Sequence, residues 1–89
     1  MAQVREQRFG FEVDWHDTQA DIVRNYRLFY YPTTCSVEMF DIKNSRPFLK
    51  RQQIPEVRLD DFHQGGKVTV LSRVLTVTGY SDGQTAAHF

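Results

Sequence analysis

Apolar and polar residues alternate along much of this chain with the period of two that is typical of half-buried β-strands. The pattern is clearest from Phe9 to Trp15, where large apolar residues are separated by Gly10, Glu12 and Asp14. Helical periodicity is nowhere sustained, so the chain is expected to be mainly β. The expected strands cover residues 9–15, 26–31, 36–42, 47–51, 67–71 and 74–79.

The stretch from Tyr26 to Arg51 carries the strongest pattern and predicts three consecutive antiparallel strands. Aromatic residues occupy both faces of the first of them, which indicates a central strand or one beneath a second element. Pro32 ends it, because proline cannot donate to a strand ladder. A polar turn follows the second strand, and Asn44 is its residue that tolerates the left-handed conformation. Pro47 is expected only at the start of a strand or on a sheet edge.

Shorter elements are expected around these strands. Residues 16–21 form a polar loop in which Asp17 is a candidate cap for one helical turn. Residues 59–62 predict a helical or 3₁₀ turn whose apolar side chains plug the core. Ser72-Arg73 joins the last two strands as a tight hairpin, although no Gly or Asn marks the turn. Residues 85–89 predict the start of a short C-terminal helix that the chain end truncates.

The expected organisation is one small domain. An antiparallel sheet of this size hides its edges most simply by curling into a barrel. Residues 1–8 are polar and are expected to form a disordered N-terminal tail, so the domain covers residues 9–89. A chain of 89 residues buries only about 60–65% of the surface that its unfolded form exposes, and its aromatic side chains supply large buried area per residue.

The charge pattern bears on possible partners. The chain has 11 basic and 11 acidic residues and no net charge, which argues against a nucleic-acid binder. The two signs are nevertheless separated, with acids clustered over residues 12–21 and basic residues over 43–51. Each cluster is either a solvated edge or a pole through which a neutral domain binds a partner.

Other features of the sequence limit the cellular compartment and the kinds of site that are expected. A single cysteine, Cys35, allows no internal disulfide, which fits a reducing cytoplasmic compartment. No apolar run approaches the ~20 residues that a membrane helix needs, so no membrane insertion is expected. His16, His63 and His88 have no metal-ligand spacing. No catalytic residue, metal site or cofactor is therefore expected.

A basic hairpin is the best candidate for a binding surface. An exposed turn and strand can present cations to a partner, and an acidic protein face is their natural complement. The candidate partner-binding residues are Lys43, Arg46, Phe48, Lys50 and Arg51. An unpaired sheet edge that accepts a neighbour's strand is a further candidate.

The order of these segments resembles the DM-10 domain, and the resemblance covers roughly residues 9–89. It rests on a tyrosine-rich strand, a Val-Glu-Met stretch and a Phe-Leu-Lys-Arg element in that order. DM-10 domains occur in a nucleoside diphosphate kinase homologue and, in tandem, in EF-hand-containing ribbon proteins of cilia. The short turn over residues 41–46 is more similar to that of the kinase homologue. The matching segments are 13–17, 26–32, 36–44, 48–51, 59–70 and 80–82.

The resemblance implies a small antiparallel barrel similar to the pleckstrin-homology fold. It implies a place in the axoneme of a cilium or flagellum, and docking to tubulin, the doublet microtubule or microtubule inner proteins without catalysis. The isolated domain is expected to be monomeric. The chain departs from the family at Thr34-Cys35, where Asp-Gly is usual.

A phosphoinositide-binding or other ligand-binding module is the alternative function. The acids of the first loop, residues 16–21, disfavour it because they repel a phosphate. Reversing Lys50 and Arg51 to glutamate is expected to weaken binding to the protein partner while leaving the fold intact. Liposome flotation with anionic lipids separates the two functions.

Overall fold

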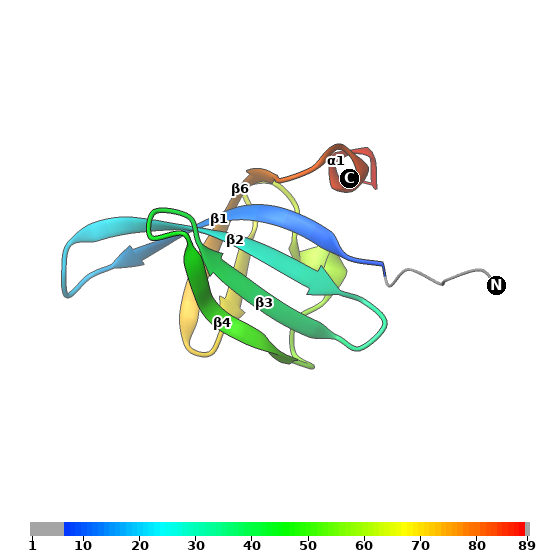
Figure 1. Cartoon of the computed structure of the whole chain (residues 1–89), viewed down its shortest axis with the longest axis horizontal. Helices are drawn as coiled ribbons and strands as arrows, with labels where there is room; N and C mark the ends of the chain where they lie inside the picture. Colours follow the sequence, from blue (N-terminus) through cyan, green and yellow to red (C-terminus); the bar gives the residue numbers. More distant parts are fainter. Residues whose placement is uncertain (1–6, 89) are drawn as a thin grey trace.

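The structure is a computed structural model that describes residues 7–88. Its six strands form one antiparallel sheet in the order β4-β3-β2-β1-β6-β5 (Figure 1). The predicted mainly β fold, its internal helical turn and its C-terminal helix are confirmed. The elements are β1 (Phe9–Asp17), β2 (Ile22–Tyr31), β3 (Ser36–Asp41), β4 (Arg46–Gln53), the 3₁₀ turn η1 (Leu59–Asp61), β5 (Lys67–Val70), β6 (Arg73–Tyr80) and α1 (Gly83–His88).

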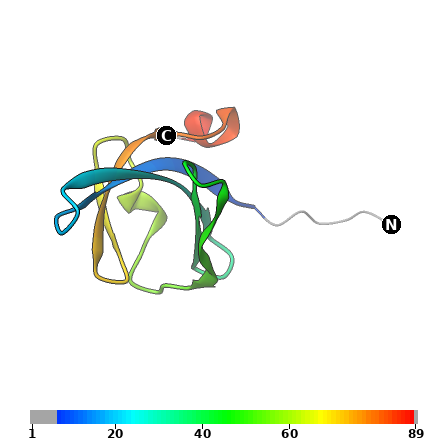
Figure 2. The same cartoon turned by 60° about the vertical axis from the view of Figure 1, so that its left-hand side comes forward.

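The sheet curls into a half-barrel rather than a fully closed barrel. β4 and β5 are its two edges and are not paired with each other. Figure 2 shows the connector from β4 and the turn η1 lying within the curl, so chain without a strand ladder occupies the open side. Ile54 and Val57 of this connector, and Phe62 just after η1, belong to the buried core cluster. They bury the concave face where strand pairing stops.

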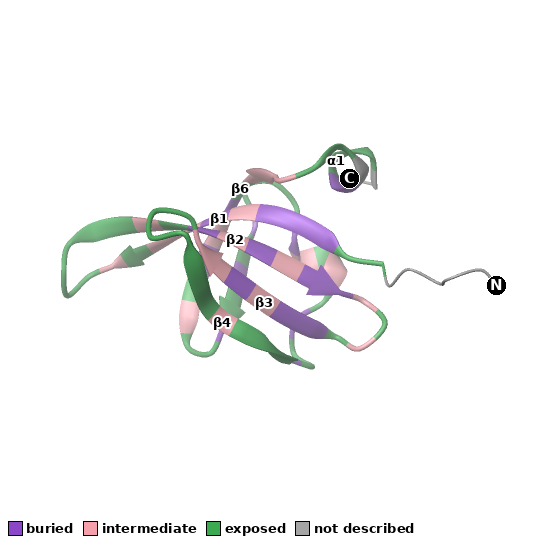
Figure 3. Cartoon of the chain, in the orientation of Figure 1, coloured by how far each residue is buried: buried purple, intermediate pink, exposed green. Residues whose placement is uncertain are grey.

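The core follows from the alternation along the strands. Phe11, Leu28 and Val37 are fully buried, whereas the residue that follows each of them in its strand is only partly buried. Figure 3 shows buried and less buried positions alternating along β2 and β3. Burying each such side chain is worth roughly 1.5–3 kcal/mol. The core cluster also includes Leu75 and Val77 of β6, so both chain halves contribute to it.

Three of the hairpin connections share one geometry. Each has four residues, and the strand residues that flank it pair directly. The last loop residue is left-handed in each case, at a φ of 52°. A side chain at such a position crowds the backbone, so glycine is favoured there. These residues are Asp21, Cys35 and Ser45.

Two of the turns differ from the prediction. Asn44 was expected to be left-handed, but Ser45 is, and the backbone N–H of Asn44 donates to Asp41 Oδ1 at 3.2 Å. Residues 18–21 form a hairpin turn in place of the candidate helical turn. Asp17 caps it as expected, because its Oδ1 accepts from the N–H of Ala20 at 3.3 Å.

The β5–β6 hairpin is confirmed with its turn one residue earlier than predicted. Val70 pairs with Arg73, so the turn consists of Leu71 and Ser72. Both have positive φ, 48° and 69°, as a type I′ turn requires. The right-handed twist of the two strands imposes this turn even without glycine or asparagine.

Most strands are longer than the alternation predicted. The β1–β2 ladder continues out to the pair Asp17↔Ile22, through polar residues that no apolar pattern records. β4 likewise extends beyond residues 47–51 at both ends. β3 is one residue shorter than expected, because Ile42 belongs to the turn.

α1 packs on the first strand through a buried hydroxyl. Thr85 is fully buried, and its Oγ1 accepts the backbone N–H of Gly10 at 2.9 Å. A Cβ atom on Gly10 would lie 2.0 Å from the Ser81 Oγ atom, so a larger residue there would have to displace the Ser81 side chain. The helix begins at Gly83, two residues before the predicted start. Phe89 lies outside the described residues.

The predicted N-terminal tail is described only at its end. Residues 1–6 lie outside the described residues, and β1 begins at Phe9 as expected. The guanidinium of Arg8 lies 4.3 Å from the centroid of the Phe29 ring. This residue is therefore part of the domain surface.

Candidate protein-interaction surface

β4 is an edge strand and is the most exposed strand of the sheet (Figure 3). It carries all the predicted partner-binding residues except Lys43, which lies in the preceding turn. The expectation that a turn and strand present these residues on an exposed hairpin is confirmed. Their orientation along the strand differs from residue to residue.

Two register irregularities divide this strand. Pro47 pairs with Phe40 and Leu49 pairs with Met39, which leaves Phe48 without a partner opposite it. A second irregularity lies between the pairs Met39↔Leu49 and Val37↔Gln52. A bulge adds a residue and breaks the alternation of faces. The predicted residues therefore do not share one face of the sheet.

Phe48 turns toward the core edge. Its ring centroid lies 4.4 Å from that of Tyr26, and the Arg73 guanidinium lies 5.2 Å from it. The side chain remains 38% exposed. It therefore packs the end of the half-barrel and adds an apolar margin to the surface.

Arg51 is held by the neighbouring turn. Its guanidinium lies 3.7 Å from the Tyr31 ring centroid, and its Nη2 donates to Thr34 Oγ1 at 3.0 Å. The Tyr31 hydroxyl donates to Glu38. Burial, and then this hydrogen bond, raise the pKa of the Tyr31 phenol, so it stays protonated as a donor. Arg51 is thus a structural residue as well as a surface cation.

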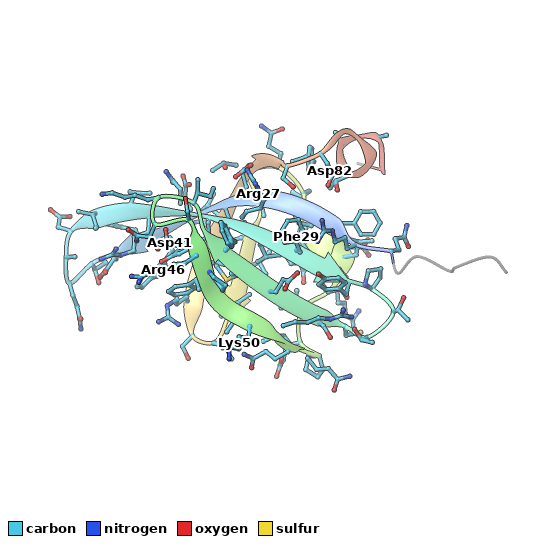
Figure 4. The ribbon with its side chains drawn as sticks, in the orientation of Figure 1. Arg27, Phe29, Asp41, Arg46, Lys50 and Asp82 are labelled. Carbon is cyan, nitrogen blue, oxygen red and sulfur yellow. The ribbon has the colours of Figure 1, made fainter. Side chains whose placement is uncertain are left out.

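Three other cations are exposed along the hairpin. None of the ion pairs among residues 7–88 involves Lys43, Arg46 or Lys50. Asp41, the strand partner of Arg46, has its pKa lowered mainly by hydrogen bonds from Asn44, and the charge of Arg46 adds a smaller effect. Figure 4 shows Arg46 and Lys50 placed along β4. These cations are available to an external anion.

One of these cations, Lys50, lines a groove that we call the β4 groove. It encloses about 270 Å³. Its lining combines aromatic and aliphatic side chains with two cations, while its one carboxylate already accepts from Tyr31. The lining residues are Phe29, Glu38, Met39, Phe40, Pro47, Leu49, Lys50 and Arg51.

Sequence reasoning missed the apolar part of this site. Phe29 alternates with the buried Leu28 and Tyr30, so it faces outward, and its strand partner is Glu38. The signal was present, because the aromatic residues on both faces of this strand indicated a covering element. Arg8 covers part of the Phe29 ring and adds a further cation beside the groove.

Among the described residues, the histidines and the cysteine that the sequence offered as candidate metal ligands or catalytic groups do not form a cluster. The described part of the chain contains no group of three or more His, Cys, Asp or Glu side chains placed to hold a metal ion. His16 lies 3.4 Å from the exposed Asp21, and Cys35 is an exposed free thiol. Within the same residues, no helix has the length and apolarity to cross a bilayer.

Sequence comparison connects the chain to one group of proteins. No protein-family model matches it. Over 82 residues it is 46% identical to nucleoside diphosphate kinase homolog 7 of Mus musculus and 45% identical to that of Rattus norvegicus. The chain is homologous to a segment of these proteins. The match takes in 92% of this chain and 21% of each relative, so the chain spans about a fifth of their length.

The homology confirms the predicted similarity to a kinase homologue for this segment. This chain, which forms a β half-barrel, is therefore homologous to one part of a larger protein. The assignment to the DM-10 domain stays a prediction.

Proposed function

We propose that the chain is a non-catalytic protein-interaction module of the DM-10 type, with a pleckstrin-homology-like fold. It docks its parent protein to the doublet microtubule of an axoneme, through tubulin or a neighbouring microtubule inner protein. The DM-10 segment order, the homology to a kinase homologue and the curled antiparallel sheet support this function.

One observation carries the proposal more than any other. Lys43, Arg46 and Lys50 are exposed without an ion pair to a described residue, and Lys50 lines a groove of mainly apolar side chains. An acidic face complements the cations and is steered toward them over long range. A single surface ion pair is worth only about 0.2–1 kcal/mol. Apolar contact in the β4 groove supplies the rest of the affinity, so the partner is a protein with an acidic and apolar face.

The arrangement at the first loop disfavours a phosphoinositide head group. Asp17 Oδ2 accepts from Arg24 Nε at 3.1 Å, so the cation nearest this loop is already neutralised. Asp21 in the same loop is almost fully exposed and presents a further negative charge. A phosphate meets repulsion there.

Co-sedimentation with doublet microtubules tests the proposal. Lys50→Glu is expected to weaken binding about threefold to tenfold, because it removes the attraction between a lysine and the acidic partner and adds the repulsion of a glutamate. Lys67→Glu is the matched control, because Lys67 is an equally exposed lysine on the opposite sheet edge, β5. Lys50 is a cleaner target than Arg51, whose reversal also removes a packed contact with Tyr31.

The outcomes separate the functions. Equal binding by both folded variants contradicts docking through the β4 groove, and no binding by the unaltered chain contradicts the microtubule partner. Flotation of the unaltered chain with anionic phosphoinositide vesicles, but not with neutral ones, would support the lipid-binding alternative instead.

A further inference from the structure

The β1–β2 hairpin extends beyond the rest of the sheet (Figure 1). β2 pairs with β1 out to Ile22 but pairs with β3 only as far as Tyr26↔Asp41. Residues 22–25 therefore lack a strand on their β3 side. Alternate backbone N–H and C=O groups of an antiparallel strand point to each side, so this margin can accept a further ladder.

A second groove lies along this margin, and we call it the hairpin groove. It encloses about 260 Å³ between residues 22–25 and residues 41–44. Three large apolar side chains at it are exposed: Ile22 by 44%, Val23 by 59% and Ile42 by 37%. Half of the six exposed large apolar residues in the described chain thus gather around this one groove. Such a cluster favours an interaction site.

This margin lacks the features that prevent strand pairing. β4, the exposed edge strand, carries a proline, two register irregularities and outward cations. Those features block the addition of a strand. Residues 22–25 contain no proline and no register irregularity in the pairing with β1, and their one cation, Arg24, is paired with Asp17.

The charges at the hairpin groove favour an acidic occupant. Arg24 is paired with Asp17 at 3.1 Å. Asp41 accepts from Asn44 at 2.8 Å, and the opposite charge beside it is that of its strand partner, Arg46. Lys43 is the lining cation left without an ion pair to a described residue. A carboxylate complements it.

We propose that the hairpin groove binds an extended segment of a partner protein, which adds as a strand to residues 22–25. Its aliphatic side chains cover Ile22 and Val23, and a carboxylate pairs with Lys43. A second copy of the chain fits less well, because a two-fold pairing brings the same uncompensated lysine to both sides. The hairpin groove shares no lining residue with the β4 groove, although Lys43 also belongs to the basic hairpin of the proposed function.

A peptide titration tests the proposal. The probe is an acetylated, amidated octapeptide of alternating valine and glutamate, followed by amide chemical shifts in the ¹⁵N-labelled chain. We expect shifts confined to residues 22–25 and 41–44, and binding at least fivefold weaker for a valine–lysine peptide of the same length. No shift at millimolar peptide, or shifts centred on β4 or β5, overturns the proposal.

Two variants with a matched control locate the site. Val23→Lys is expected to weaken binding at least tenfold, while Val74→Lys leaves it unchanged, because Val74 is 53% exposed on β6 outside the groove. Lys43→Glu is expected to reverse the preference between the two peptides. Equal effects of the two valine variants overturn strand addition here. Concentration-dependent dimerisation of the unaltered chain that Val23→Lys abolishes overturns the choice of occupant in favour of a second copy.

Discussion

The two ends of the half-barrel are built differently. At one end, Phe62 stacks on Phe11 with ring centroids 4.7 Å apart and lies 5.4 Å from Tyr30, and α1 packs beside them. At the other end, the guanidinium of Arg73 lies 5.1 Å from the Trp15 ring and 5.2 Å from that of Phe48. We call the first end the closed end, because its aromatic side chains are buried. We call the second end the open end, because apolar and charged side chains remain exposed there.

The comparison shows how a small domain separates stability from binding. Side chains at the closed end lose nearly all their exposed surface and therefore stabilise the fold. The open end carries the exposed Ile22 and Val23 and the cations Lys43 and Arg46. These groups contribute little to folding and remain available to partners.

The largest expected effect is at the closed end. Phe62→Ala is expected to lower the free energy of unfolding by about 3–5 kcal/mol, because it removes a fully buried ring and leaves a cavity. Val23→Ala at the open end is expected to change it by less than about 0.5 kcal/mol. Urea denaturation followed by the fluorescence of Trp15 measures both, and similar losses would remove the distinction between the ends.

A smaller effect tests the docking of α1 at the closed end. Thr85→Val keeps the shape but leaves the N–H of Gly10 without its acceptor, which costs about 1–3 kcal/mol. Thr78→Val is the control, because the exposed Thr78 donates to a strand carbonyl from the surface. We expect the control to lose less than about 0.5 kcal/mol. Equal stability of the two variants would mean that the buried hydroxyl is not needed.

The hairpin turns provide a comparison in which both ends should respond alike. Cys35→Gly at the closed end and Ser45→Gly at the open end each relieve a left-handed residue. Each is expected to raise the free energy of unfolding by about 0.5–1 kcal/mol, after the added entropy of glycine in the unfolded chain. Thermal denaturation of the two single variants measures the gains. A loss at either site would show that the side chain contributes more than its strain costs.

The smallest expected effect is the loss of folding stability at low pH, through two aspartates at the open end. Hydrogen bonds lower the pKa of Asp17, chiefly from the backbone of Ala20, and that of Asp41, chiefly from the side chain of Asn44. A carboxylate with a lowered folded-state pKa stabilises the protein above its unfolded value of 3.8, and this contribution is lost as the pH falls through the lower value.

Denaturation at pH 5 and pH 2.5 checks this titration. Asp41→Asn is expected to narrow the difference in stability between the two pH values, because the variant has no carboxylate there to protonate. Asp60→Asn, in the turn η1, is the control. The same narrowing in both variants would contradict the assignment to the open end.

Much of the fold was readable from local patterns. Alternation, β-branched runs and turn residues together located every strand, and the spacing of Leu59 and Phe62 identified the plug of the core. The length of the β1–β2 hairpin was not readable, because its outer pairs, such as Asp17↔Ile22, join a polar residue to an exposed one. Pairing with a neighbouring strand, rather than burial, extends it.

The candidate site was predicted in composition but not in arrangement. Alternation places Phe48 and Lys50 on one face, yet the bulge at Phe48 turns its ring toward Tyr26. A register irregularity depends on the partner strand and leaves no mark in the sequence of its own strand. The outward Phe29 and the unpaired margin of β2 follow likewise from the lengths of neighbouring strands.

Amide hydrogen exchange with and without doublet microtubules tests the central claim most directly, namely that the closed end maintains the fold while the basic edge binds. In the free chain, we expect the slowest exchange around Phe11 and Leu28, both fully buried. On adding doublets, we expect new protection over residues 43–51 and unchanged exchange in β5. New protection confined to β5 and β6, or none at saturating doublets, would contradict the account.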